Sequence, residues 1–293
     1  MAYVILVFGV ICCSTSIIFI KKSDMESEFL AAYRTLLSAI ILIPLCIYDV
    51  KNKMDIDIKS YLKISLIPGL LLALHFISWM YGARMAEPAN SSLIVNLTPV
   101  VSPIFLFFII REKLTFKEVL GTAIVMCGVV ILAINDFHTN PQYFWGDIIC
   151  FVSMIFFACY LIFSRKNKNL QSLWLYVAFL YTWCGLICLM IGILIGKNPI
   201  EKFDKNNCLQ ILLLACITTI LGHSLLNYAM KYIRGQIVSL INQFQFIIGA
   251  IWGVVFFSVP PTKYFFLACV FLIVGCFIAV YKPISIKKIK AAS

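Results

Sequence analysis

Residues 74–112, LHFISWMYGARMAEPANSSLIVNLTPVVSPIFLFFIIRE, decide the fold of this chain. They form an apolar segment that carries His75 and Trp79, a Glu-Pro break, and a second apolar segment that carries Asn96 and two prolines. An imperfect copy follows about 147 residues later at 222–258, GHSLLNYAMKYIRGQIVSLINQFQFIIGAIWGVVFFS. Two copies of one helical hairpin, each with polar residues inside apolar sequence, predict a duplicated membrane protein with a central site.

The composition of the whole chain is that of an integral membrane protein. Of its 293 residues, 62% are hydrophobic and 13% are charged, whereas about a quarter of the residues in a soluble domain are charged. In lipid every backbone amide must be hydrogen-bonded within the protein, which favours helices. The apolar runs are long and unbroken, unlike the alternating segments of about ten residues in membrane strands. The predicted fold class is therefore all-α.

Ten segments are apolar and long enough for membrane helices, which need about 20 residues. They are 2–20, 29–48, 61–84, 89–110, 117–136, 145–164, 172–196, 209–230, 236–257 and 263–281. The chain divides near residue 140 into two five-helix repeats, 1–137 and 145–282, and a basic cytoplasmic tail at 283–293. Because five is odd, the second repeat must be inverted, as in secondary transporters whose site lies at the repeat interface.

The net charge of +11 would in a soluble protein suggest a nucleic-acid partner. Here the basic residues fall in the short connections between apolar runs, so membrane topology explains them better, and no nucleic acid is expected. With the N-terminus inside, sixteen of the 24 Lys and Arg residues lie in inside loops or the tail, and seven lie in outside loops. We expect a multi-pass protein of the cell (inner or plasma) membrane with both termini cytoplasmic.

Cysteine and histidine show no pattern of a metal centre. Most of the twelve cysteines lie inside apolar runs, no Cys-x-x-Cys pair exists, and the three histidines are far apart. Cysteine acts here as a small hydrophobic residue. No nucleotide-binding loop or catalytic signature is present. We expect no metal, no cofactor, no catalytic residue and no enzymatic activity.

Several short motifs are typical of one family of membrane proteins. They are Glu87-Pro88-Ala89, Leu97-Thr98-Pro99-Val100, Arg111-Glu112-Lys113-Leu114, Gly121 and Gly128-Val129-Val130-Ile131-Leu132. This pattern resembles the EamA domain of the drug/metabolite transporter superfamily, in two copies over essentially the whole chain. The second copy departs from it, with Gln245 where Pro is common and Ser258 where Glu is common. The resemblance implies a transporter in which helices three, four, eight and nine line the central path.

The polar residues inside the predicted helices are the candidates for binding, because such residues are costly in a membrane and usually face a cavity or another helix. His75 and Trp79 are four residues apart and share one helix face, as do His223 and Asn227. The candidate substrate-binding residues are His75, Trp79, Asn96, His223, Asn227, Asn242, Gln245 and Arg34. The alternative is that these side chains only bond neighbouring helices.

Arg34 is the one strongly charged residue well inside a predicted helix. It has two open roles: pairing with a carboxylate or phosphate of a substrate, or a structural role such as pairing with Glu28. No mid-membrane carboxylate is evident, so facilitated diffusion or exchange is as well supported as proton coupling.

The sequence thus predicts a secondary transporter that moves a small polar metabolite by alternating access. The metabolite would be an amino acid or derivative, possibly one like S-adenosylmethionine. The alternatives are an intramembrane lipid-modifying enzyme and a non-transporting structural or sensor protein. The expected partners are the metabolite and the lipid bilayer, and the protein would be a monomer or a homodimer.

Overall fold

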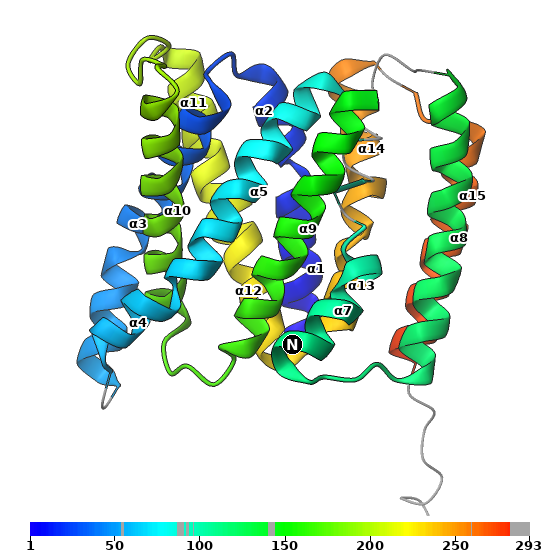
Figure 1. Ribbon diagram of the computed structural model, residues 1–293, viewed down its shortest axis with the longest axis horizontal. Coiled ribbons are helices and arrows are strands. Elements are labelled where there is room, and N and C mark those ends of the chain that lie inside the picture. Colours follow the sequence, from blue (N-terminus) through cyan, green and yellow to red (C-terminus); the bar gives the residue numbers. More distant parts are fainter. Residues whose placement is uncertain are drawn as a thin grey trace, which may run out of the picture.

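The computed structural model describes residues 1–53, 56–86, 91, 94–95, 97–139, 144–258 and 260–281, with the side chains of 129 and 132–139 left aside. The elements in these residues are all helices, and no strand occurs among them (Figure 1). Three of the features expected above lie outside the described residues: the Glu87-Pro88 break, Asn96 and the tail at 283–293.

The helices follow the predicted apolar segments closely. In the first half they are α1 (Ala2–Ser14), α2 (Ser16–Lys22), α3 (Ser27–Asn52), α4 (Ile58–Ile64), α5 (Leu66–Met85), α7 (Thr98–Ile110) and α8 (Phe116–Thr139). In the second half they are α9 (Phe144–Lys166), α10 (Leu173–Leu194), α11 (Lys205–Leu213), the π-helix η2 (Leu214–His223), α12 (Ser224–Tyr232), α13 (Gly235–Asn242), α14 (Phe244–Phe257) and α15 (Lys263–Val280).

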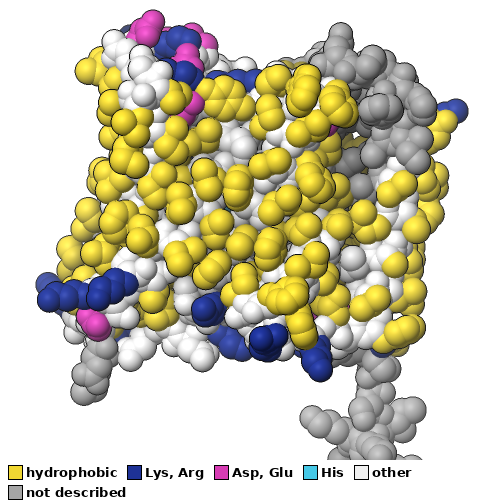
Figure 2. All heavy atoms as spheres, in the orientation of Figure 1, with side chains coloured by type: hydrophobic (Ala, Val, Ile, Leu, Met, Phe, Trp, Pro, Cys, Tyr) yellow, Lys and Arg dark blue, Asp and Glu magenta, His cyan; other side chains and the backbone are white. Residues whose placement is uncertain are grey.

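Eight helical stretches of the described chain are long and apolar enough to span a membrane. The helix α7 is shorter, at 13 residues, and α8 has 24 residues. Hydrophobic side chains cover the middle of the face in Figure 2, and Lys, Arg, Asp and Glu side chains lie toward its two ends. The structure is therefore that of a multi-pass helical membrane protein, and the number of ten spans stays a prediction.

Two of the predicted helices are interrupted in the middle of the span. The segment 2–20 breaks at Thr15, whose amide bonds the carbonyl of Cys12, three residues back, at 3.3 Å. The segment 236–257 breaks at Gln243, whose amide bonds Leu240 in the same way at 3.2 Å. At the first break the hydroxyls of Ser14 and Thr15 also bond helix carbonyls, which competes with the regular helix ladder.

The helices form one bundle in which distant parts of the chain pack together. The helix α3 packs on α10, α5 packs on α9, and α1 packs on η2 and α12. The pair α8 and α15 stands at one side of the bundle (Figure 1). This arrangement surrounds the middle of the bundle with α1, α3, α5, α9, η2 and α14.

Small residues bring α8 and α15 into close contact. A Cβ atom added at Gly121 would lie 2.4 Å from the carbonyl oxygen of Gly275. A Cβ atom added at Gly128 would lie 3.2 Å from the Cα of Ala268. Small residues at such crossings allow helix backbones to approach in lipid, where van der Waals packing drives association.

We predict that Gly121→Val separates α8 from α15 and destabilises the protein. The added methyl groups meet backbone atoms that cannot rotate away, and overpacking of this kind costs about 1–3 kcal/mol. The measurement is thermal unfolding of the purified protein. The control is Ala123→Val, which adds bulk to an exposed position on the same helix; equal unfolding temperatures for the two variants would contradict the prediction.

Candidate functional site

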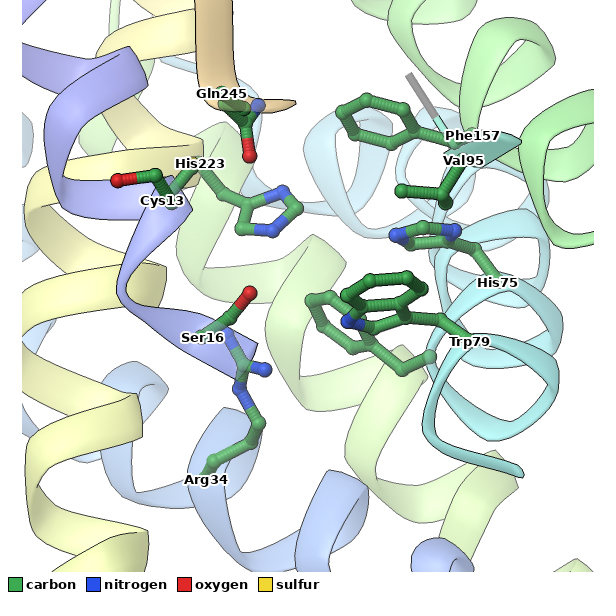
Figure 3. A pocket seen from close by; sticks show the side chains of 11 residues that line it. Cys13, Ser16, Arg34, His75, Trp79, Val95, Phe157, His223 and Gln245 are labelled. Atoms are coloured by element: carbon green, nitrogen blue, oxygen red, sulfur yellow. The ribbon is translucent and has the colours of Figure 1, made fainter. Parts of the chain in front are cut away.

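A cavity of about 30 Å³ lies in the middle of the bundle. Figure 3 shows His75 and Trp79 on one side of it, across from His223 and Arg34, with Gln245 reaching in from α14. The lining residues are Cys13, Ser14, Ser16, Arg34, His75, Phe76, Trp79, Val95, Phe157, His223 and Gln245. Five of the eight candidate residues therefore meet at one cavity.

His75 is held in place by α9. Its ring nitrogen Nδ1 lies 2.8 Å from the hydroxyl of Ser153 and 3.1 Å from the carbonyl oxygen of Ser153. The hydroxyl of Ser153 also reaches the carbonyl oxygen of His75, at 2.9 Å. The imidazole stacks on Phe157, with ring centroids 4.6 Å apart and an angle of 22°. One edge of His75 is thus fixed, and the ring faces the cavity in a defined orientation (Figure 3).

His223 comes from the other half of the chain and faces His75. The two ring centroids are 6.3 Å apart, and the edge of Phe76 lies against His223 at 5.0 Å. Nδ1 of His223 is buried and has no hydrogen-bond partner among the described residues. A buried imidazole nitrogen without a partner is a site where a polar ligand atom gains a hydrogen bond.

Arg34 lies on α3 and is 1% exposed. Its Nη2 donates to Thr218 at 2.6 Å and to Thr219 at 2.9 Å, and its Nε donates to Thr219 at 3.0 Å. Its guanidinium carbon lies 4.3 Å from the centre of the Phe76 ring. The alternative pairing with Glu28 does not occur, because Glu28 accepts hydrogen bonds from Tyr81 and Lys197.

The remaining candidates lie behind the cavity wall or outside the described residues. Asn242 is buried at the end of α13, and its side-chain oxygen accepts a hydrogen bond from Gln245 at 2.5 Å. Asn227 donates to the hydroxyl of Tyr160 and to the carbonyl oxygen of His223, so it supports the site from α12. Asn96 is not among the described residues.

Two helices outside the predicted central path, α1 and α9, also contribute to the wall, and α3 contributes the predicted candidate Arg34. Cys13, Ser14 and Ser16 of the first span line the cavity. The run Cys-Cys-Ser-Thr-Ser at 12–16, the only small polar run in that apolar segment, is the signal that could have identified them.

The cavity is too small for a metabolite as it stands. A volume of about 30 Å³ holds on the order of two water molecules. Pockets for small organic ligands have volumes of roughly 300–1,000 Å³. A metabolite therefore enters only if the surrounding helices separate.

Polar contacts connect the two halves of the chain at the end of the bundle that holds Met1 (Figure 1). Arg165 at the end of α9 pairs with Glu112 at 3.1 Å, and Arg234 pairs with Glu118 at 2.5 Å. The amide of Gly235 donates to Glu112 at 3.3 Å. The hydrogen bonds from Arg234 to Glu118 raise the pKa of Arg234 above its ordinary value. We call these residues the near-end network.

A second set of contacts closes the opposite end of the bundle. Lys197 reaches Glu26 at 2.7 Å, Glu28 at 3.1 Å and Tyr81 at 2.5 Å, and Lys202 reaches Glu26 at 3.3 Å. The hydrogen bond from Lys197 lowers the pKa of Glu26 below its ordinary value, although burial opposes this effect. We call these five residues the far-end network. Both networks join one half of the chain to the other.

The described residues contain no group of three or more His, Cys, Asp or Glu side chains that could hold a metal ion. The lining of the cavity includes imidazole, guanidinium, hydroxyl, amide, indole and thiol groups, which suit hydrogen bonding to a polar solute.

Comparison with known proteins gives the cavity its context. Residues 1–134 and 144–281 match the EamA-like transporter family. An uncharacterized transporter of Acidianus ambivalens is 27% identical over 181 residues, which cover 60% of this chain and 62% of that protein, less than two-thirds of its length. The WAT1-related protein At3g28100 of Arabidopsis thaliana is 23% identical over 247 residues, covering 72% of this chain and 69% of that protein.

Some relatives have a name that specifies a solute, S-adenosylmethionine. The S-adenosylmethionine uptake transporter of Rickettsia bellii is 26% identical over 141 residues, which cover 44% of this chain and 47% of that protein. A solved crystal structure superposes with a TM-score of 0.75 at 16% identity, covering 95% of this chain and 97% of its own, which shows a shared fold. The two family matches together span nearly the whole chain, and the protein belongs to the EamA-like transporter family.

Proposed function

We propose that this protein is a secondary transporter that carries a small polar metabolite across the cell membrane through the central cavity. The observation that carries the proposal is the meeting of His75 from the first matched half with His223 from the second at a buried, polar-lined cavity. A site shared by two halves can open toward either side of the membrane when the halves move against each other.

We infer further that the chain has ten spanning helices in two inverted repeats, 1–137 and 145–282. A shift of 147 residues relates several features of the two halves. Arg111 ends α7 and Ser258 ends α14, and both have left-handed backbone angles. The same shift relates Gly121 to Ala268 and Gly128 to Gly275. Gly121 contacts Gly275, and the related residues Ala268 and Gly128 also contact each other. Such paired contacts are what a two-fold relation between repeats produces.

The transport cycle that fits this architecture is alternating access. The near-end and far-end networks each tie the halves together, and the cavity between them is smaller than a metabolite. Breaking one network while keeping the other would open the cavity to one side at a time. The charge distribution of the loops supports an orientation with both termini in the cytoplasm, which makes the near-end network the inner one.

An amino acid or a derivative is the solute class that we favour. The cavity combines hydrogen-bonding groups with the aromatic rings of Phe76, Trp79 and Phe157. The name of the Rickettsia bellii relative supports S-adenosylmethionine as one member of the panel to be tested. A lipid-modifying enzyme and a structural or sensor protein are less well supported, because the family to which the chain belongs consists of transporters.

The first test is counterflow into liposomes that contain the purified protein, with a panel of radiolabelled α-amino acids and S-adenosylmethionine. We predict uptake of at least one member, and a loss of about tenfold or more in His75→Phe, because the variant keeps an aromatic ring but cannot hydrogen-bond the solute in transit. A tenfold change corresponds to about 1.4 kcal/mol of transition-state stabilisation.

Ser78→Ala is the control for His75→Phe. Among the described residues, the hydroxyl of Ser78 bonds the carbonyl oxygens of Leu74 and His75 on its own helix. The variant should therefore transport at the wild-type rate. Wild-type rates in both His75→Phe and Gln245→Leu would show that the cavity is not the transport site. No uptake of any panel member by the wild-type protein would count against this solute class.

The second test concerns the near-end network. We predict that Glu112→Gln speeds hydrogen–deuterium exchange in 111–118 and 230–238, because it removes the charge that holds Arg165 and weakens the acceptor for Gly235. Exchange in the far-end segments 23–28 and 197–207 should not rise. The measurement is mass spectrometry of the protein in lipid nanodiscs.

Glu201→Gln is the matched control, since Glu201 is exposed at the opposite end of the bundle. It should leave exchange in 111–118 and 230–238 unchanged. Exchange in Glu112→Gln that is indistinguishable from this control would mean that the near-end network does not restrain opening.

A further inference from the structure

The charge of Arg34 has no counter-charge among the described residues. None of the ion pairs formed by the described residues includes Arg34, and its two threonine partners are neutral. Glu28, on the same helix, is occupied by Lys197 and Tyr81. A charge buried in a low-dielectric interior is unfavourable unless an opposite charge compensates it.

One nitrogen of the Arg34 guanidinium is unused. Nε and Nη2 make the bonds to Thr218 and Thr219, whereas Nη1 is buried and has no hydrogen-bond partner among the described residues. Arg34 lines the central cavity together with His223, whose Nδ1 is also without a partner. Figure 3 shows the guanidinium directed toward Ser16 and the open centre of the site. The unused donor therefore belongs to a side chain that lines the cavity.

A purely structural role does not account for the charge. Tyr181 stands 147 residues after Arg34 on α10, the helix that packs against α3. Its neutral hydroxyl lies 3.2 Å from the carbonyl oxygen of Thr219 and 2.9 Å from the hydroxyl of Ser224. The neutral side chain of Tyr181 thus forms hydrogen bonds with the segment that contains Thr219 and Ser224, as Arg34 does with Thr218 and Thr219. Attachment to η2 does not require a guanidinium, and what Arg34 adds is a positive charge with free N–H groups.

We propose that Arg34 Nη1 binds a carboxylate group of the transported solute. A carboxylate would supply both the missing charge and an acceptor for the free N–H groups, and bonds between guanidinium and carboxylate are among the strong charge-assisted ones. His223 would bond a second polar atom of the solute. The apolar part of the solute would lie against Trp79 and Phe157. The single arginine selects a monoanionic group. This inference rests on the proposed transport function for its solute, although the binding it describes can be measured without transport.

The test uses the full-length protein purified in detergent and three acid–amide pairs: acetate and acetamide, benzoate and benzamide, L-phenylalanine and L-phenylalaninamide. The unfolding temperature reports binding to the folded state by mass action. At least one acid should bind roughly tenfold or more tightly than its amide, as expected for a charge-assisted bond. Arg34→Gln should remove this preference, and Arg34→Lys, which keeps the charge, should keep a preference for the acid.

Arg111→Gln controls for the loss of one positive charge, because Arg111 is exposed at the end of α7, away from the cavity lining. It should bind like the wild-type protein. Equal affinity for acid and amide in the wild-type protein, no stabilisation by any of the three acids, or a preference that survives Arg34→Gln overturns the assignment. If Arg34→Gln does not fold, the wild-type pairs and Arg34→Lys decide the matter.

Liposome uptake separates this inference from the proposed function. If binding is selective for the acids and depends on Arg34, but no solute is taken up, the results support carboxylate binding at Arg34 and contradict the proposed transport function. Uptake of an amino acid and its amide at equal rates would keep the transporter and reject the anion site.

Discussion

The hydrocarbon core of a bilayer offers no water, so each polar group inside the bundle needs a partner within the protein. This constraint explains how most polar side chains of the middle layer are used. Ser153 and His75 satisfy each other, Asn227 bonds Tyr160, and Gln245 bonds Asn242. Among the buried side-chain atoms of the described residues that have no hydrogen-bond partner, Nη1 of Arg34 and Nδ1 of His223 belong to residues that line the same cavity. The cavity lining therefore includes a guanidinium and an imidazole that can each make a further hydrogen bond.

The π-helix η2 has a direct part in forming the site. It carries Thr218, Thr219 and His223 within ten residues, and π-helical segments occur often at functional sites. Two adjacent threonines of this segment bond one guanidinium, while His223 at its end lines the cavity. Residues next to the breaks at Thr15 and Gln243, namely Ser14, Ser16 and Gln245, line the same cavity. Local departures from the regular helix thus produce most of the polar wall.

The contacts at the two ends of the bundle differ from those in its middle. The end networks consist of ion pairs in which Lys197, Lys202 and Arg234 are partly exposed, and solvent weakens such pairs. The middle holds a buried charge and a pair of imidazoles, where each contact is strong and each unsatisfied atom is costly. The pairing of α8 with α15 rests on small residues instead, and so can remain closed while the ends rearrange.

The sequence by itself determined the helical membrane fold, because hydrocarbon solvent permits few structures to span it and the apolar runs are long enough to read directly. It also predicted His75, Trp79, His223, Gln245 and Arg34 as candidates for binding, since a polar residue in an apolar run stands out, and all five line one cavity. Only the tertiary structure decided which of the candidates share a cavity, that Asn227 and Asn242 lie behind the wall, and that Arg34 bonds threonines instead of Glu28. Those outcomes depend on contacts between helices that are far apart in the chain. They also depend on a π-helix and two helix breaks, which cannot be predicted from hydropathy.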